Sequence, residues 1–270
     1  MDSIQTDVSN PALITAIRAN LCAFFRHLGE SHPADYFEDQ KFARLHTPIP
    51  HPMFNLVLCS DLPADGDETF IQESIQYFRA KGTDVFTWWL EPPLVRSDWE
   101  PALSKYGFNF SDDTPGMAVD LQALDESVQT VEGLEVRVVA DEAAFKIWAH
   151  IFTLGYGLPL DWEKFVFDVW GKLGFDSPIR NYLGYWNGQP VSTSCLFLGG
   201  GAAGIYNVAT LPKVRGRGIG AALTLKPLQD ARAVGYRIGT LQASEMGYSI
   251  YKKLGFKHLC QMENFYLSLP

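Results

Sequence analysis

The feature that most limits how this 270-residue chain can fold is a glycine-rich turn between an expected strand and an expected helix. Residues 205–210 are rich in the β-branched and aromatic residues that favour strands. The turn that begins at Arg215 reads Arg-Gly-Arg-Gly-Ile-Gly, and residues 221–234 then have helical character. A second strand at 237–244, a short helix at 246–254 and a last strand follow. This order predicts an α/β (α+β) fold in which helices flank a mixed central sheet.

The segment upstream of the turn extends the same unit. Residues 134–139 are expected to form its first strand, and residues 141–152 and 161–170 have apolar residues on one face, as helices do. Residues 181–198 predict a hairpin, because its Asn187-Gly188 pair accepts the positive φ angles of a type I′ turn. The polar stretch 121–133 is interpreted as a linker between two units.

The first half of the chain has the same order of elements as the second half. A strand, a helix, a strand and a helix are expected there at residues 54–59, 70–82, 85–90 and 99–108. We therefore predict an internal duplication, with a degenerate copy at 1–125 and a second copy at 131–270. A coincidence between two short α/β patterns is the alternative. The first copy's loop, with Asp61, Asp65, Asp67 and Glu68 and no basic residue, would repel an anion, so only the second copy is expected to hold a ligand site.

Composition narrows the class of protein. Hydrophobic residues make up 47% of the chain and charged residues 20%, which are values of a globular protein. No apolar run is long enough to cross a bilayer and the N-terminus does not resemble a secretory signal, so we expect no membrane association and a cytoplasmic location. The four cysteines lie far apart, which indicates neither a metal site nor a disulfide framework.

Charge is distributed unevenly along the chain. The net charge of −9 argues against a nucleic-acid partner. Residues 205–260 nevertheless carry nine Lys and Arg against two acidic residues, whereas the rest of the chain has 13 basic and 29 acidic residues. A basic segment around a glycine turn indicates an anionic ligand, and a solvated helix face is the alternative.

Three glycines in the turn allow backbone N–H groups to approach a phosphate without Cβ clashes. The helix N-terminus adds partial positive charge, and Lys213, Arg215 and Arg217 add whole charges. A pyrophosphate is the ligand that this arrangement predicts. The stretch Gly216-x-Gly218-x-x-Ala221 also fits a dinucleotide fingerprint, but that fingerprint directly follows its strand and opens a longer βαβαβ unit.

Two motifs resemble a known family. Arg215-x-x-Gly218-x-Gly220 is similar to the acyl-CoA signature of the GNAT superfamily of N-acetyltransferases, and Tyr251-Lys-Lys-Leu-Gly-Phe256 is similar to its C-terminal Tyr-x-x-x-Gly-Phe signature. The resemblance covers residues 131–270, while the first half resembles only a degenerate GNAT-like copy.

The resemblance implies that acetyl-CoA, as the acyl donor, lies between strands 205–210 and 237–244. Its pantetheine would pair with main-chain groups of the first strand, and its pyrophosphate would lie on backbone amides of the turn. Ser244 stands where many members have a cofactor-contacting Asn. The implied cofactor-binding residues are Val208, Ala209, Thr210, Arg215, Gly216, Arg217, Gly218, Ile219, Gly220, Ala221 and Ser244.

The resemblance also implies direct transfer of the acetyl group to an amine. Tyr251 resembles the family's general acid, and a phenol, with a pKa of about 10, stays protonated at neutral pH. Glu245 is the candidate general base, with a solvent-facing helix-cap residue as the alternative for it.

The acceptor is left open by the sequence. It is a small-molecule amine or a protein amine, and neither its identity nor the oligomeric state can be read from the residues. Two other functions stay open: a non-catalytic acyl-CoA-binding or interaction protein, and, more remotely, a nicotinamide-dependent oxidoreductase.

Overall fold

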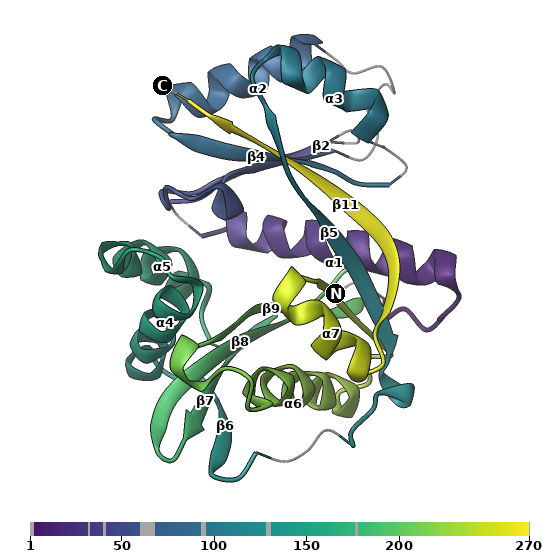
Figure 1. The fold of residues 1–270 in the computed structure, drawn as a ribbon, viewed down its shortest axis with the longest axis vertical. Coiled ribbons are helices and arrows are strands. Elements are labelled where there is room, and N and C mark those ends of the chain that lie inside the picture. The colour runs from purple at the N-terminus through teal and green to yellow at the C-terminus, as the bar shows by residue number, and fades with distance from the viewer. Residues whose placement is uncertain are drawn as a thin grey trace. The chain divides into compact units, whose positions relative to one another are not determined.

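The computed structural model describes residues 3–31, 33–39, 42–59, 68–92, 96–127, 131–175 and 178–269 (Figure 1). The chain forms two compact units that are not consecutive in sequence. Unit 1 contains Met1–Phe24 and Gly116–Leu259, and unit 2 contains Phe25–Pro115 and Cys260–Pro270. The strands belong to one 11-stranded mixed sheet, and each unit contains part of it with helices packed against that part, which confirms the predicted fold class.

Unit 1 is built on six strands in the order β5-β10-β9-β8-β7-β6. Only β10 and β9 run parallel, and every other neighbouring pair in this sheet is antiparallel. The strands are β5 (Asn109–Asp120, through its last residues), β6 (Leu134–Val138), β7 (Ile179–Trp186), β8 (Gln189–Gly199), β9 (Ala202–Thr210) and β10 (Ile238–Gln242). The helices are α1 (Asn10–Gly29, through its first fifteen residues), α4 (Glu142–Tyr156), α5 (Glu163–Trp170), α6 (Ile219–Ala233) and α7 (Glu245–Lys253).

The predicted hairpin is confirmed as β7 and β8. Its turn residues Asn187 and Gly188 have φ angles of 50° and 77°, as a type I′ turn requires. Pro227 lies inside α6, which runs from Ile219 to Ala233. Pro227 is buried there, and we have no physical account of why a proline occupies this position.

Helices cover both faces of the unit 1 sheet. Tyr182 on β7 donates a hydrogen bond to Asp230 of α6, so the α6 face includes Ser194, which pairs with Tyr182 across the strands. Side chains alternate between faces along a strand, and Phe197 of β8 therefore lies on the opposite face. There it contacts Phe24 of α1 with ring centroids 5.6 Å apart.

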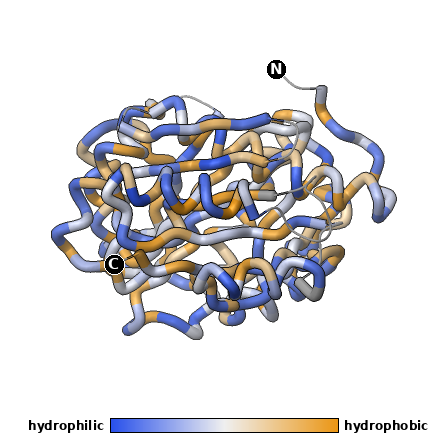
Figure 2. Tube along the Cα trace, turned by 90° about the horizontal axis from the view of Figure 1, so that it is seen from above, coloured by the Kyte–Doolittle hydropathy of each residue, from blue (hydrophilic) through white to orange (hydrophobic). Residues whose placement is uncertain are grey.

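Unit 2 has a sheet in the order β1-β2-β3-β4-β11, followed by the first part of β5. Its elements are β1 (Asp35–Glu38), β2 (Phe42–His46), β3 (Leu56–Cys59), α2 (Glu68–Ala80), β4 (Val85–Leu90), α3 (Arg96–Lys105) and β11 (Lys257–Ser268). An aromatic core that includes Phe78, Phe86, Trp88 and Trp99 packs between these elements. In Figure 2 hydrophobic and hydrophilic positions alternate along helices and strands, as expected for elements with one buried face.

The two units exchange their last strands. The order β3-α2-β4-α3-β5 matches the order β9-α6-β10-α7-β11, and β3 and β4 are parallel, as are β9 and β10. However, β5 pairs with β10 in unit 1, whereas β11 pairs with β4 in unit 2. Unit 1 includes Met1–Phe24 and unit 2 includes Cys260–Pro270, so the units do not coincide with the predicted ranges 1–125 and 131–270. The internal duplication stays a prediction.

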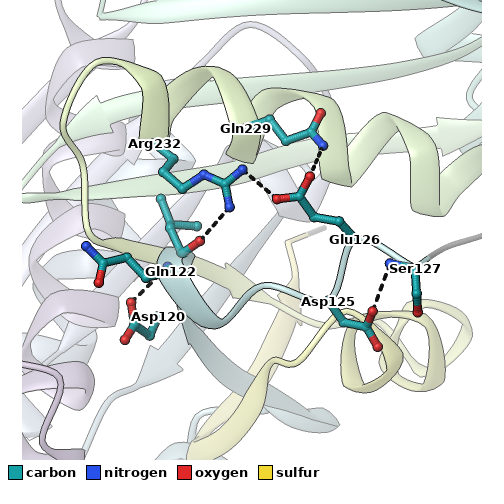
Figure 3. Close-up of polar contacts among 8 residues, drawn as sticks. Asp120, Gln122, Asp125, Glu126, Ser127, Gln229 and Arg232 are labelled. Atoms are coloured by element: carbon teal, nitrogen blue, oxygen red, sulfur yellow. Dashed lines mark hydrogen bonds and ion pairs between the residues drawn. The ribbon is translucent and has the colours of Figure 1, made fainter.

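The segment expected to be a linker is tied to α6 along its first residues. Glu126 accepts hydrogen bonds from Gln229 and Arg232, and Arg232 also donates to the carbonyl of Leu121 (Figure 3). Asp125 accepts from the backbone N–H of Ser127 in the same segment. The part of this stretch that the structure describes is therefore held on unit 1 by charged and polar contacts. Residues 60–67, with three of the four acidic residues of the first copy's loop, and 128–130 lie outside the described residues.

Among the residues that the structure describes, no helix has the length and apolar character that a bilayer span requires.

Candidate active site

Strands β9 and β10 are paired over only a small part of their length. The register joins Ala203 to Gly239 and Gly204 to Thr240, and no further pair between these strands is described. β9 nevertheless continues for six more residues to Thr210. The main-chain groups on this side of β9 therefore have no strand partner in the described register, and an extended ligand could bond to them.

A bulge interrupts β9 along this unpaired stretch. Cys195 pairs with Tyr206 and Thr193 pairs with Ala209, so Asn207 and Val208 together lie opposite the single residue Ser194. Asn207 has a φ angle of 55°, which is unusual for a residue other than glycine. A bulge takes main-chain groups out of the regular ladder and redirects the strand, and bulges are common beside active sites.

Side chains of β8 hold the other edge of β9. Thr193 donates a hydrogen bond to the carbonyl of Asn207, and Ser192 donates to the carbonyl of Ala209. Because successive carbonyls of a strand point to opposite sides, those of Val208 and Thr210, on either side of Ala209, point away from β8, and that of Thr210 accepts a hydrogen bond from Arg215. These are the residues whose main chain is expected to pair with pantetheine.

Two buried amide donors lie at the unpaired stretch, one on each strand. Asn207 Nδ2 on β9 and Gln242 Nε2 on β10 have no hydrogen-bond partner among the described residues. A buried donor without an acceptor costs about 1–3 kcal/mol, so an acceptor supplied by a ligand would stabilise the fold here. This observation fits a ligand that carries amide carbonyls.

The glycine turn leads from β9 into the N-terminus of α6. Gly216 and Gly218 have φ angles of 77° and 83°, and a Cβ added at Gly216 would point into open space. Gly218 is the N-cap residue and no side chain caps the helix. The first N–H groups of a helix have no intrahelical partner, so those following Gly218 are available to an anion. Ile219 and Ala221 are buried and fix this end of α6, while Gly220 is half-buried.

Arg215 is exposed, and its guanidinium donates hydrogen bonds to two main-chain carbonyls. Its Nε donates to the carbonyl of Thr210 over 2.9 Å and its Nη2 donates to the carbonyl of Gly155 over 2.8 Å. The guanidinium therefore ties the end of β9 to the end of α4, and its charge lies beside the turn. The sequence pattern predicted the charge, but not these two acceptors.

Gly155 is a site residue that the sequence analysis missed. A Cβ added there would lie 2.7 Å from the Cβ of Ala209 and 3.6 Å from the backbone N of Thr210. Only glycine lets α4 approach β9 so closely. A glycine inside an otherwise helical pattern is a signal of such close packing, and it could have identified this position.

Arg217 lies over the ring of Trp186, with 4.8 Å between its Cζ and the ring centroid. The indole N–H of Trp186 donates to the carbonyl of Glu132 over 3.0 Å, which fixes the ring. A stacked guanidinium keeps its N–H groups available at its edge. Arg217 is therefore an oriented cation at the entrance to α6. Lys213 lies one turn earlier and is exposed.

Tyr251 lies on α7 and is 8% exposed. Burial raises the pKa of Tyr251 to about 12, so its phenol is a proton donor at neutral pH. Gly247 allows the ring to lie over the first turn of α7, since a Cβ there would be 2.6 Å from the ring. The phenols of Tyr156 and Tyr251 lie close enough that Tyr251 contributes, after burial, to raising the pKa of Tyr156.

Ser244 and Glu245 both lie at the start of α7. Ser244 is the N-cap residue, and its hydroxyl accepts a hydrogen bond from the backbone N–H of Gly247 over 3.2 Å. This cap explains a serine at this position, and its hydroxyl proton remains available for donation. Glu245 is exposed in the first turn of the helix, where a carboxylate is favourable.

In the part of unit 2 that the structure describes, β3 has no unpaired stretch like that of β9. The parallel strands β3 and β4 are paired along the whole of β3, from Leu56 with Thr87 to Cys59 with Leu90. Among the described residues, pairing with β4 therefore occupies the edge of β3 that an extended ligand would need, and a single ligand site in the second copy stays a prediction.

Among the described residues, no group of three or more His, Cys, Asp or Glu side chains could hold a metal ion. Cys195 is buried, and burial raises the pKa of its thiol, which makes it a poor nucleophile.

Comparison with protein families gives one match. Residues 201–259 match the model described as an acetyltransferase (GNAT) domain. This range contains β9, the glycine turn, α6, β10 and α7, which are the elements that form the site. No curated protein matches the chain.

Solved structures share the fold over nearly the whole chain. A GCN5-related N-acetyltransferase from Kribbella flavida is 18% identical, with a TM-score of 0.67, over 93% of this chain and 95% of that one. A GCN5-related N-acetyltransferase from Sphaerobacter thermophilus is 15% identical, with a TM-score of 0.61, over 98% and 94%. A tandem GNAT protein from the clavulanic acid biosynthesis pathway is 13% identical, with a TM-score of 0.56, over 94% and 87%.

Proposed function

We propose that this chain, whose residues 201–259 carry a GNAT acetyltransferase domain, is an acetyl-CoA-dependent N-acetyltransferase that transfers an acetyl group directly to an amine. The observation that supports this most is the continuity of the site. The unpaired edge of β9 runs from the bulge at Asn207 to Thr210, and the glycine turn then leads to an uncapped helix N-terminus. An extended acyl chain that ends in a pyrophosphate has the shape and charge to use both parts.

The donor would be held mainly by the backbone. Main-chain groups of Val208 and Thr210 would bond to the pantetheine, while Ala209 between them is held to β8. Amides from Gly216 to Ala221 would bond to the pyrophosphate. Arg217 would add charge to the phosphates, whereas Arg215 would position the end of β9 through its bond to Thr210. Acetyl-CoA supplies the activated acetyl group, and the chain orients it.

Proton transfers would involve two residues of α7. The amine nitrogen forms a bond to the thioester carbon while the carbon–sulfur bond breaks, and Tyr251 gives its proton to the departing sulfur. A main-chain N–H of the β9 bulge would bond to the carbonyl oxygen as negative charge develops on it. Glu245 is the proposed base for the proton that leaves the amine, directly or through water, because it is exposed at the start of α7.

The acceptor is proposed only as a class, a small-molecule or protein amine. We further propose that the chain is a two-copy GNAT protein in which the first copy has lost its donor site. The pairing of β4 along the whole of β3 supports this, and a structure described as a tandem GNAT protein matches 94% of this chain over 87% of its own.

Calorimetric titration with acetyl-CoA, CoA and NADH at low and moderate salt tests the donor assignment. We expect salt-sensitive binding of acetyl-CoA and CoA, and none of NADH. Gly216→Ala is expected to weaken acetyl-CoA binding by about tenfold, since it fills the space in which a phosphate would lie.

Gly174→Ala is the matched control, because Gly174 also has a positive φ of 82° with open space around it. Equal affinities of the two variants, or no binding of acetyl-CoA by the wild type, would contradict the proposal. Tight acetyl-CoA binding without turnover on a broad amine panel would favour a non-catalytic acyl-CoA-binding protein instead.

A further inference from the structure

The first helix of the chain is bound to the unit 1 sheet through one buried amide. Asn20 on α1 is fully buried. Its Nδ2 donates to the carbonyls of Gly199 and Ala202 over 2.8 and 3.0 Å, and more weakly to that of Phe197 over 3.4 Å. These acceptors lie at the turn between β8 and β9. Asn20 therefore anchors α1 to backbone carbonyls at this turn.

The same amide also contacts the strand that carries the candidate site. The hydroxyl of Tyr206 donates to Oδ1 of Asn20 over 2.7 Å. The ring of Tyr206 stacks on Phe24, one turn further along α1, with centroids 3.9 Å apart and planes within 4°. Tyr206 is thus held at both its hydroxyl and its ring by α1.

Tyr206 is the last residue of β9 before the bulge. Asn207, with its φ of 55°, follows it directly, and the pairing with β8 resumes only at Ala209. The position of Tyr206 therefore sets where the bulge begins and how its main-chain groups point.

Glycines on β9 and its turn are fitted to this helix. A Cβ at Gly204 would overlap Oδ1 of Asn20, and a Cβ at Gly200 would lie 2.5 Å from the carbonyl of Ala19. Such close approach requires glycine at both positions. The backbone of N-terminal Gln5 also donates to the carbonyl of Gly201 over 2.9 Å.

We propose that Asn20 is a positioning residue of the acyl-transfer site, which acts through Tyr206 to fix the β9 bulge where the thioester carbonyl binds. The inference rests on the proposed function. It gives α1 a part in a site whose proposed binding and proton-transfer residues all lie after residue 200. It predicts that loss of the Asn20–Tyr206 contact changes the polarisation of the bound carbonyl more than it changes donor affinity.

Tyr206→Phe tests this with the smallest change, because it removes the hydroxyl and keeps the ring on Phe24. Tyr182→Phe is the matched control. It removes one tyrosine hydrogen bond of 3.0 Å from the same sheet, on the face covered by α6. The readouts are the C=O stretching frequency of bound carbonyl-labelled acetyl-CoA, the melting temperature, and kcat and KM with an amine that the wild type acetylates.

We expect both variants to lower the melting temperature by a similar amount. Only Tyr206→Phe should shift the carbonyl frequency toward its value in free acetyl-CoA. It should also lower kcat by about tenfold, since small displacements of reacting groups have large effects on rate, while KM for acetyl-CoA should stay within about twofold of the wild type. Phe24→Leu, which removes the stack and keeps the hydrogen bond, is expected to act in the same direction and serves if Tyr206→Phe does not fold.

A carbonyl frequency in Tyr206→Phe and Phe24→Leu equal to that of the wild type would overturn the inference, whatever the melting temperatures are. The same is true if Tyr182→Phe shifts the frequency equally, because the effect would then be a general loosening of the sheet. Failure of the proposed function is distinct from both, since the wild type itself would then not bind acetyl-CoA.

Discussion

Replacement of Tyr251 by phenylalanine separates the chemistry of the site from its packing. The ring of Tyr251 is 8% exposed, lies over Gly247 and is 6.0 Å from the ring of Phe256, so phenylalanine fills the same space. Only the hydroxyl is lost. We expect the free energy of unfolding to change by less than about 1 kcal/mol, the scale of a single hydrogen bond.

The expected effect on turnover is much larger. A positioned general acid contributes about 10²–10⁴-fold to a rate. Burial raises the pKa of Tyr251 to about 12, which makes it a weaker acid than a free phenol. A thiolate that leaves into the same desolvated region also has a raised pKa, as the buried Cys195 thiol does, and the two shifts offset each other. We therefore expect Tyr251→Phe to lower kcat by about 10²-fold, or about 2.7 kcal/mol of barrier.

The assay follows release of free CoA thiol at saturating acetyl-CoA and amine, beside calorimetric affinities for acetyl-CoA. The affinity of Tyr251→Phe should stay within about twofold of the wild type, because the proton is transferred only during the reaction. The acid role also predicts the pH profile. An acid with a pKa of about 12 is lost only as the pH rises through that value, so kcat should show no alkaline decline from this group below about pH 11. A kcat in Tyr251→Phe within twofold of the wild type would refute the role.

Other variants test the positive charge, the packing and the pH dependence of unit 1. Arg217→Gln should weaken acetyl-CoA binding by about threefold to tenfold at low salt and by less at high salt, and a salt-independent effect would contradict an electrostatic role. Gly155→Ala gains about 1 kcal/mol of helix propensity, but it places a Cβ 2.7 Å from the Cβ of Ala209, and such overpacking costs about 1–3 kcal/mol. The melting temperature should therefore fall or at best stay unchanged, and a higher melting temperature would contradict the close contact. Arg237 holds the pKa of Asp120 below its usual value, so this pair stabilises the fold above about pH 4 and the effect is lost as the pH falls further. Asp120→Asn should thus destabilise the protein at pH 7 and have less effect at pH 3 in thermal melts, whereas equal effects at both pH values would contradict the ion pair.

Local patterns predicted the parts of the site that depend on local geometry. The positive φ angles at Gly216 and Gly218 follow from a turn between a strand and a helix, and the order of β9, α6, β10 and α7 follows from their periodicity. The φ angles of Asn187 and Gly188 follow from the turn type. Each of these features is set by residues within a few positions of one another.

Long-range features could not be predicted in the same way. Arg215 has the charge that the turn was expected to need, but its acceptors are carbonyls of Thr210 and Gly155, and Gly155 lies 60 residues away in sequence. The pairing of β5 with β10 and of β11 with β4 involves two strands with similar patterns, and no local signal distinguishes which partner each one takes.

The helix α1 is a different case, because its signal was present and was missed. Its buried residues Leu13, Ile17, Leu21, Phe24 and Leu28 are spaced three or four positions apart, which is the spacing of one helix face. Recognition of this helix would have revealed a buried Asn20 on its apolar face. A buried amide on such a face needs partners elsewhere in the fold, so the sequence already contained a reason to look for a second contact.

The difference between the two units follows from how far their parallel strands are paired. β3 has four residues and β4 pairs with all of them, so hydrogen bonds between the strands use the edges that a ligand would need. β9 has nine residues, of which β10 pairs with two, and the bulge at Asn207 turns the remainder away from a regular ladder. An open edge of this kind is costly unless a ligand or other groups bond to it. In unit 1 this edge lies next to a helix N-terminus without a side-chain cap, as the proposed acyl-CoA ligand requires, and the hydrogen bond from Tyr206 to Asn20 holds β9 directly before the bulge.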